Sequence, residues 1–149
     1  MQLIPIKPDG SLVGGTEILT DEARDAIEAT IGLYNNVGHA PPWIGYLVVV
    51  EGEWVGACAF KSTPQDKAVE IAYYTFPQHE DLGYATAMAQ ALITMAHATD
   101  PTLMILAQTL AEEGPSPHIL RKLGFELAEE FEDPDDGLLW EWRLAPLSS

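Results

Sequence analysis

The feature that most constrains the fold is an uncharged run of eighteen residues from Leu82 to Thr99. This length reaches the range of membrane-spanning helices, but the helical part, from Tyr84 onward, spans only about 22 Å at the rise of an α-helix. An otherwise apolar surface with one polar stripe predicts a helix that other elements cover on most sides, with His97 as a hydrogen-bonded structural side chain. The stripe consists of Thr86, Gln90, Thr94 and His97.

Strand patterns flank this helix on both sides. Before it, two apolar runs enclose a Glu-Gly-Glu turn, which predicts a hairpin, and a third strand follows. After it come one buried strand and a second hairpin. The expected strands cover residues 43–50, 54–61, 68–76, 102–110, 125–131 and 138–144.

Two further helices complete the pattern. Thr20 can cap a helix that ends near Gly38, and a short helix opens at Ser116, next to a proline. Residues 1–19 predict a short strand and a loop. The order β-α-β-β-β-α-β-α-β-β predicts a single α/β domain over residues 1–149, with a mixed, mostly antiparallel sheet flanked by helices.

The last expected strand carries a regular alternation of large apolar residues. Leu138, Trp140, Trp142 and Leu144 occupy every second position. A period of two predicts that this face packs inward. A weaker alternative is an interaction protein in which Trp140 and Trp142 face a partner.

The charge balance limits the partners of the chain. There are 7 Lys plus Arg against 23 Asp plus Glu, which gives a formal net charge of −16. Nucleic acids and anionic membranes are disfavoured as partners, because both attract Lys and Arg. A cationic or amine-bearing substrate fits this field through long-range attraction, and the alternative is that the acids only keep the protein in solution.

The cysteine content indicates a reducing compartment. Cys58 is the single cysteine, so no internal disulfide forms, and its apolar neighbours predict a buried strand position. The first seven residues lack the basic and apolar regions of a signal peptide. We expect a cytoplasmic protein, and no Cys/His cluster suggests a metal site.

A strand, a glycine-containing turn and a helix follow one another from Ile71 to Ala85 and beyond. Such a turn directs unpaired backbone N–H groups and the positive end of a helix at one point, which suits a pyrophosphate. Gly83 alone is weak evidence, and an ordinary strand-to-helix connection remains the alternative.

Two motifs at a regular separation add to this pattern: VEIAYYTFPQHEDLGYATAMAQALI and AQTLAEEGPSPHILRKLGFELAEE. Together they resemble the GNAT N-acetyltransferase superfamily, in its ribosomal-protein and small-amine branch, over about residues 43–144. The family pattern is matched by Val69-Glu70-Ile71-Ala72-Tyr73, Pro77, His79, Gly83-Tyr84-Ala85-Thr86, Ser116, Leu120, Lys122 and Gly124-Phe125.

The resemblance implies acetyl-CoA as cosubstrate, an amine acceptor and no metal. The pantetheine arm would lie between the strand of Tyr73 and Tyr74 and the strand of Gln108-Thr109, which splay apart in this fold. The pyrophosphate would lie on backbone N–H groups of the turn and the first helical residues. These are Leu82, Gly83, Tyr84, Ala85 and Thr86.

Acyl transfer to an amine needs a neutral amine, a polarised carbonyl and a proton for the leaving thiolate. Glu70 is the candidate base, and the alternative is an exposed glutamate without a role. Backbone N–H groups near Tyr73 would polarise the carbonyl. Many relatives protonate the thiolate with a tyrosine where this chain has Leu120, so Ser116 becomes the candidate acid; its competing role is the N-cap of its helix.

The chain departs from the family pattern at acidic positions. Glu80, Asp81 and Leu82 stand where the family has Arg or Gln, then Gly and a basic residue, and Glu113 replaces an asparagine. Acids at these places oppose an anionic cofactor, unless the turn binds through backbone N–H groups. A catalytically silent GNAT-like domain with another ligand or a protein partner is therefore the rival interpretation. The sequence leaves open the amine, the acyl chain and whether the protein forms a homodimer.

Overall fold

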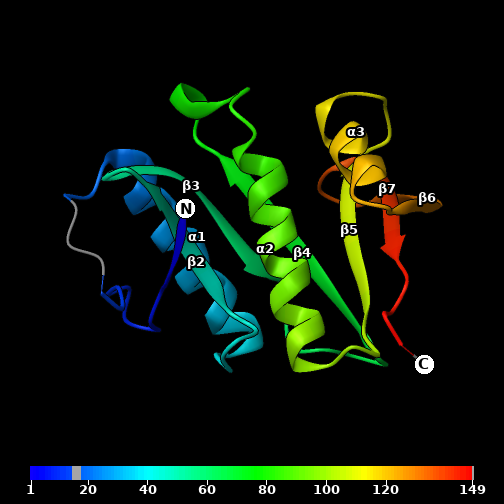
Figure 1. Cartoon of the computed structure of the whole chain (residues 1–149), viewed down its shortest axis with the longest axis horizontal. Coiled ribbons are helices and arrows are strands. Elements are labelled where there is room, and N and C mark those ends of the chain that lie inside the picture. Colours follow the sequence, from blue (N-terminus) through cyan, green and yellow to red (C-terminus); the bar gives the residue numbers. More distant parts are fainter. Residues whose placement is uncertain (15–17, 149) are drawn as a thin grey trace.

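The computed structural model describes residues 1–14 and 18–148, and its order of elements confirms the predicted α/β fold. One seven-stranded sheet has the order β1-β2-β3-β4-β5-β7-β6 (Figure 1). Residues 15–17 of the expected N-terminal loop lie outside the described residues. The strands are β1 (Gln2–Pro5), β2 (Gly45–Val50), β3 (Glu53–Phe60), β4 (Ala68–Thr75), β5 (Met104–Leu110), β6 (Glu126–Asp133) and β7 (Gly137–Leu144); the helices are α1 (Asp21–Val37), the 3-10 turn η1 (Pro77–His79), α2 (Tyr84–Thr99) and α3 (Pro115–Lys122).

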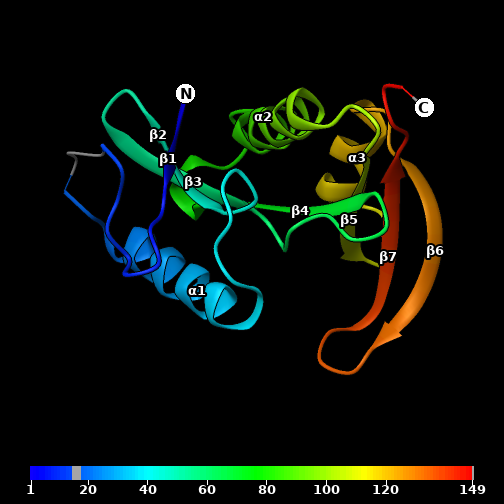
Figure 2. The same cartoon turned by 90° about the horizontal axis from the view of Figure 1, so that it is seen from below.

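Helices cover the two faces of the sheet unequally. Helices α2 and α3 lie on one face, and α1 lies on the other face beneath β2 and β3 (Figure 2). The Tyr46 hydroxyl oxygen of β2 lies 3.3 Å from Met95 Sδ of α2, while Tyr34 of α1 donates to the Ile6 carbonyl at 2.8 Å. The side of β4, β5 and β7 that faces away from α2 and α3 therefore carries no helix of the described residues.

Helix α2 is buried as its sequence predicts. Met88, Leu92 and Ala96 are fully buried in the core. His97 is also buried, and its Nε2 lies 3.0 Å from the Leu103 carbonyl oxygen, which confirms the structural role expected for this histidine. No helix of the described residues is long and apolar enough to span a membrane.

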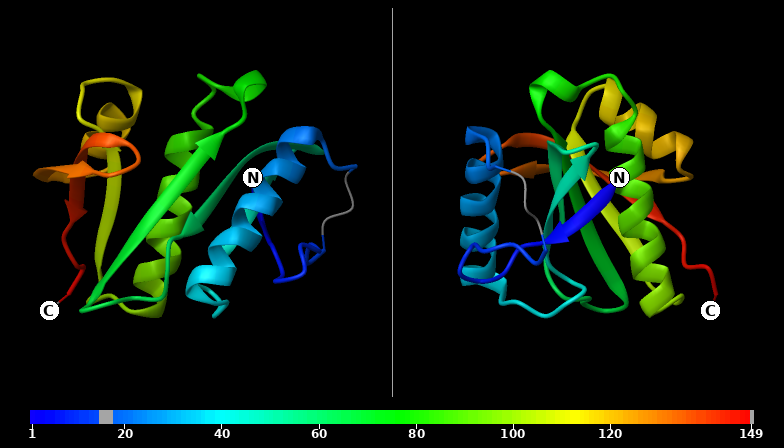
Figure 3. Two further views of the ribbon diagram at one scale, coloured as in Figure 1. Left: turned by 180° about the vertical axis from the view of Figure 1, so that it is seen from behind. Right: turned by 60° about the vertical axis from the view of Figure 1, so that its left-hand side comes forward.

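Strands β4 and β5 pair over three positions and then separate. Their parallel register covers Ala68↔Met104, Val69↔Ile105 and Glu70↔Leu106, yet the strands continue to Thr75 and Leu110. Figures 1 and 3 show the two strands diverging from this point. Each strand keeps its other neighbour, β3 or β7, so the divergence opens a slot in the middle of the sheet.

The last hairpin corrects one sequence expectation. Trp142 is fully buried, and its Nε1 donates to Thr109 Oγ1 at 3.0 Å, so this tryptophan belongs to the core. Leu138, however, is 51% exposed, and Leu139 is buried in its place. The prediction that Leu138 faces inward is wrong because pairing with β5 ends at Leu139, and Leu138 lies beyond the end of that strand.

Candidate active site

Two cavities meet at the slot between β4 and β5. The first, of about 270 Å³, is called here the sheet cavity. The second, of about 320 Å³, lies against the turn before α2 and is called the turn cavity. Tyr73 and Ser116 line both, so the cavities adjoin at these two residues, and together they are called here the path through the sheet. The sheet cavity is also lined by Lys61, Glu70, Gln108, Thr109, Asp136 and Leu139, and the turn cavity by Tyr74, Thr75, His79, Glu80, Asp81 and Gly83-Tyr84-Ala85-Thr86.

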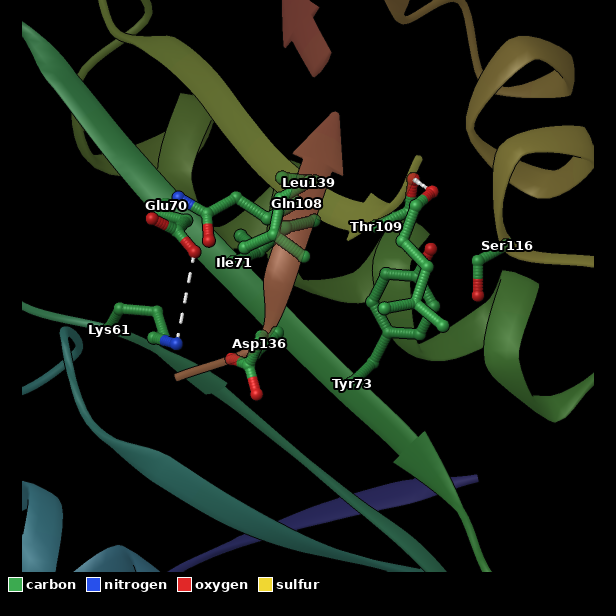
Figure 4. Close-up of a pocket in the computed structure, with 12 residues that line it drawn as sticks. Lys61, Glu70, Ile71, Tyr73, Gln108, Thr109, Ser116, Asp136 and Leu139 are labelled. Carbon is green, nitrogen blue, oxygen red and sulfur yellow. Dashed lines mark hydrogen bonds and ion pairs between the residues drawn. The ribbon is translucent and has the colours of Figure 1, made fainter. Parts of the chain in front are cut away.

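Glu70 lies in the sheet cavity at the last position where β4 and β5 pair. Its neighbour Ile71 is buried on the α2 side, so the alternation of the strand turns the Glu70 side chain to the opposite face. The carboxylate is 22% exposed, and its Oε2 lies 3.9 Å from Lys61 Nζ (Figure 4). Burial raises the pKa of Glu70; Lys61 partly offsets this effect, and the charge of Glu141 reinforces it. A carboxyl with a raised pKa that lines a cavity is a candidate for a functional role.

Tyr73 and Tyr74 have different surroundings although they are adjacent. Tyr73 packs against the core, and burial raises the pKa of its phenol to about 12. Figure 4 shows its ring pointing from β4 toward Thr109 and Ser116. Tyr74 points to the other face and is 57% exposed, with its ring 5.9 Å from that of Phe76. Tyr73 therefore occupies the slot, while Tyr74 lies at its rim.

The turn before α2 exposes backbone donors to the turn cavity. Gly83 has φ 84°, and a Cβ added there would meet nothing within 4 Å, so the turn is open. The first bond of the helix runs from the Ala87 N–H to the Gly83 carbonyl at 3.1 Å. Among the described residues, the N–H groups of Tyr84, Ala85 and Thr86 have no acceptor outside the helix. Leu82 does not line this cavity, and it is 62% exposed.

The acidic departures from the family pattern lie in two different places. Glu80 and Asp81 line the turn cavity, whose described lining contains no Lys or Arg. Glu113 forms a bidentate ion pair with Arg121, with Nη2–Oε2 at 3.0 Å, and lines neither of these cavities but a third one of about 170 Å³, which shares Ser116 with both. Arg121 lowers the pKa of Glu113 by this hydrogen bond. The Glu113 charge is therefore compensated within the chain, whereas those of Glu80 and Asp81 face the cavity.

Ser116 is not a helix cap. Helix α3 begins at Pro115, with Gly114 as N-cap and no side-chain cap bond. Proline is well suited to the first helical position, and Pro115 takes it instead of Pro117, so the N-cap lies two residues earlier than expected and the expectation that Ser116 is the N-cap is wrong. Ser116 is instead exposed toward both cavities. Leu120, one turn further on, is fully buried.

The path through the sheet fits an elongated cosubstrate with amide and phosphate groups. Thr75 Oγ1 is buried in the lining of the turn cavity without a hydrogen-bond partner among the described residues. A buried hydroxyl without a partner is costly, and a rotation about χ1 that exposed this oxygen would let it bond to an amide of a pantetheine arm. The free N–H groups of α2 supply the matching site for phosphate. The residues present therefore fit acetyl-CoA, against the opposing charges of Glu80 and Asp81.

Several lining residues carry no sequence signal. Lys61 follows the end of β3, eight residues before the first motif, and Asp136 belongs to the turn between β6 and β7, six residues after the second motif. Thr75 looks like an ordinary strand residue. Only the pairing of the sheet brings these residues to the path. The described residues hold no group of three or more His, Cys, Asp or Glu side chains placed to bind a metal ion.

A sequence model of the acetyltransferase (GNAT) domain family matches residues 13–126. Among solved structures, a GNAT-family acetyltransferase from Bacillus anthracis is 20% identical with a TM-score of 0.65, covering 93% of this chain and 78% of its own. The ribosomal L7/L12 alpha-N-protein acetyltransferase RimL in complex with coenzyme A is 19% identical with a TM-score of 0.66, covering 89% and 76%. A mutant of the spermidine N-acetyltransferase SpeG from Vibrio cholerae is 14% identical with a TM-score of 0.64, covering 81% and 76%. At these identities the similarities establish the fold, and no curated protein matches the sequence.

Proposed function

The chain belongs to the acetyltransferase (GNAT) family, and from this premise we propose that it transfers the acetyl group of acetyl-CoA directly to a primary amine of a small molecule or a protein N-terminus. The observation that carries this proposal is the meeting of two cavities at the slot between β4 and β5. A cosubstrate entering from one side and an acceptor from the other would meet beside Tyr73. Direct transfer in a ternary complex needs this arrangement, because both substrates must be bound together.

The turn cavity would hold the cosubstrate. Acetyl-CoA supplies an acetyl group activated as a thioester. The N–H groups of the turn and of α2, from Gly83 to Thr86, would bind the pyrophosphate through fixed dipoles and the positive end of the helix, without Leu82, which lies outside the cavity lining. The β4 backbone at Tyr73 and Tyr74 would hold the pantetheine arm, and its N–H groups would polarise the carbonyl.

Glu70 would act as the general base. An alkyl ammonium resembles lysine, with a pKa of about 10.4, so at neutral pH a base must take its proton before attack. Glu70 lies in the sheet cavity, and burial raises its pKa toward that of a useful base. Ser116, which lines both cavities, would hold the departing sulfur by a hydrogen bond, directly or through water.

The acceptor would be a cation. Lys61 is the one positive side chain in the described lining of the sheet cavity, against Glu70 and Asp136, so an ammonium group brings this site to charge balance. The net charge of −16 attracts the same group over a longer range. The names of RimL and SpeG refer to a protein N-terminus and to spermidine, and both acceptors are amines.

The decisive experiment measures cosubstrate binding and turnover together. Acetyl-CoA at 100 times its dissociation constant should stabilise the fold by about 2.7 kcal/mol in thermal unfolding. Release of free thiol in the presence of a panel of mono-, di- and polyamines then measures transfer. Glu70→Gln is the matched control, because it should bind acetyl-CoA and release little thiol. Absence of any thermal shift at millimolar acetyl-CoA would refute the proposal.

A silent GNAT-like domain is the second candidate. Glu80 and Asp81 favour it, because they bring two carboxylates to the cavity where the phosphates would lie. Such a domain would show no thermal shift with acetyl-CoA and no thiol release with any amine, while remaining folded.

A further inference from the structure

We infer that the hydroxyl of Tyr73 is the group that gives its proton to the departing thiolate, which rests on the proposed function. In many relatives a tyrosine protonates the thiolate, and this chain has Leu120 at that position. Leu120 is fully buried and has no acidic proton. Tyr73 comes from a different element, β4, and lies where the sheet cavity and the turn cavity meet.

The sequence places Tyr73 in the slot by strand alternation. Val69 and Ile71 are buried on the α2 side of β4, and Tyr73 continues this face opposite Cys58 of β3. Pairing with β5 stops at Glu70, three residues earlier. The phenol ring therefore lies in the gap between β4 and β5 instead of under a neighbouring strand (Figure 4).

The Tyr73 hydroxyl has no hydrogen-bond partner within residues 1–14 and 18–148. The two tyrosines buried elsewhere behave differently: Tyr34 donates to the Ile6 carbonyl at 2.8 Å, and Tyr46 to the Pro42 carbonyl at 2.7 Å. Among the described residues, two buried side-chain polar atoms lack a hydrogen-bond partner, namely Trp54 Nε1 and Thr75 Oγ1. The Tyr73 hydroxyl is not one of these buried atoms. Its hydroxyl is therefore reachable from the cavities and free to donate to a ligand.

The proton balance of the step closes without a further reactant. Tyr73 donates to sulfur while the bond between the acetyl carbon and sulfur breaks and the bond from the amine nitrogen to that carbon forms; sulfur keeps the electron pair of the broken bond. Glu70 first takes one proton from the ammonium group and passes it to bulk water, so that a neutral amine attacks. After attack the nitrogen gives up a second proton to Glu70, and the phenolate regains a proton from that site through water. The products are the amide and the free thiol.

Tyr73 suits this role better than Ser116 does. A phenol is protonated at neutral pH even at its usual pKa of about 10; burial raises the pKa of Tyr73 to about 12, which makes it a weaker acid than a free phenol but still a stronger one than a serine alcohol. A thiol has a pKa of about 8.5, so complete proton transfer from the phenol to the thiolate is unfavourable. The hydrogen bond from the phenol stabilises the developing thiolate until the phenolate is neutralised. The other titratable or charged groups around Tyr73 are Cys58 on β3, Lys61, Glu70 and Asp136 in the sheet cavity, and His79, Glu80, Asp81 and Tyr84 in the turn cavity.

The test compares Tyr73→Phe with Ser116→Ala, because these are the two residues that line both cavities. Tyr73→Phe keeps the ring that packs on the core, and it should lower kcat by about 10² to 10⁴. Ser116→Ala should lower kcat by less than about tenfold. A readout independent of turnover is the pKa of the thiol of bound coenzyme A, followed by the ultraviolet absorbance of the thiolate. Tyr73→Phe should raise this pKa by about one unit, since one hydrogen bond to a charged group is lost.

Each outcome decides the inference. A Tyr73→Phe protein that binds coenzyme A, turns over at the parental rate and leaves the thiol pKa unchanged would overturn the role of Tyr73 and leave the proposed function standing. The same would follow if Ser116→Ala produced the larger defect in both measurements. A parent protein that binds no coenzyme A in calorimetric titration would overturn the proposed function and this inference with it.

Discussion

The sheet cavity and the turn cavity meet at Tyr73 and Ser116, yet they offer different chemistry to a ligand. The sheet cavity uses side chains of both signs, with Lys61 between the carboxylates of Glu70 and Asp136. The turn cavity uses backbone N–H groups, and its charged lining residues, Glu80 and Asp81, repel phosphate.

This difference explains which part of the site can tolerate substitution. A backbone N–H is present whatever the side chain, so under the proposed function the turn cavity would bind phosphate although the basic residues of the family pattern are missing. A base or a charge partner exists only as a side chain. The sheet cavity should therefore be sensitive to single substitutions, and the turn cavity should respond mainly to changes of the backbone.

The largest expected effect is that of Glu70→Gln in the sheet cavity. Loss of the general base should lower kcat by about 10² to 10⁴, and the deficit should shrink at high pH, where free amine is abundant. The affinity for acetyl-CoA should change little, because Glu70 does not line the turn cavity. Thiol release and calorimetric titration measure the two quantities. An unchanged kcat at neutral pH would remove Glu70 from the chemistry.

The same variant should be more stable than the parent at neutral pH. Burial raises the pKa of folded Glu70 above its unfolded value, so the neutral form is favoured by folding. This contribution to stability is complete below the unfolded pKa and is lost as the pH rises through the folded pKa. Gln stays neutral at every pH, so the free energies of unfolding of the two proteins should converge in acid and separate at pH 7.

A backbone change should give the largest effect in the turn cavity. Tyr84 is the first residue of α2, a position that accepts proline, so Tyr84→Pro removes one N–H and keeps the helix. Tyr84→Ala is the matched control, which loses the ring and keeps the N–H. A charge-assisted hydrogen bond is worth about 1.5–3 kcal/mol, so the proline variant should bind coenzyme A roughly ten- to hundredfold more weakly than the alanine variant. Equal affinities in calorimetric titration would show that this N–H does not contact the phosphates.

The two cavities also differ in how far the sequence predicts them. The strand, turn and helix around Gly83 are contiguous, so local patterns predict the turn cavity and its backbone donors. Glu70 and Ser116 were predicted only by resemblance to a family. Lys61 and Asp136 have no local signal, since they reach the sheet cavity through the pairing of β3 with β4 and of β6 with β7.

The errors in predicting the fold have the same origin. The alternation in β7 is real and places Trp142 in the core, but it cannot tell where the neighbouring strand stops, so Leu138 was assigned inward wrongly. Likewise the sequence could not show that Glu113 is paired with Arg121, because the ion pair depends on how the loop after β5 folds against α3.

Reversing one charge in the turn cavity should have a moderate effect. Glu80 lines the cavity, and Glu80→Arg replaces repulsion of the phosphates by attraction. For a charge about 8 Å from the pyrophosphate, acetyl-CoA affinity should rise roughly tenfold, and more at low salt than at high salt. Calorimetric titration at two salt concentrations measures this gain. Equal affinities would mean that the side chain points away from the ligand, and tight binding by the variant alone would indicate a natural protein that does not use coenzyme A.

The smallest expected effect concerns Lys61, the positive member of the sheet cavity. Its Nζ lies 3.9 Å from Glu70 Oε2, and its backbone N–H donates to the Glu70 carbonyl at 2.9 Å, so the two residues are held opposite each other. Lys61 favours the ionised carboxylate, so Lys61→Met should raise the pKa of Glu70, and the acid limb of the pH–rate profile should move to higher pH with it. Lys67→Met is the matched control, because it breaks the Lys67–Asp100 ion pair of 3.3 Å, which lines neither cavity. Carboxyl NMR titration of Glu70 reads the shift directly. If neither lysine variant changed the Glu70 titration or the acid limb of the pH–rate profile, Lys61 would be a solvated surface charge. The chemical difference between the sheet cavity and the turn cavity would then depend on Glu70 and Asp136 alone.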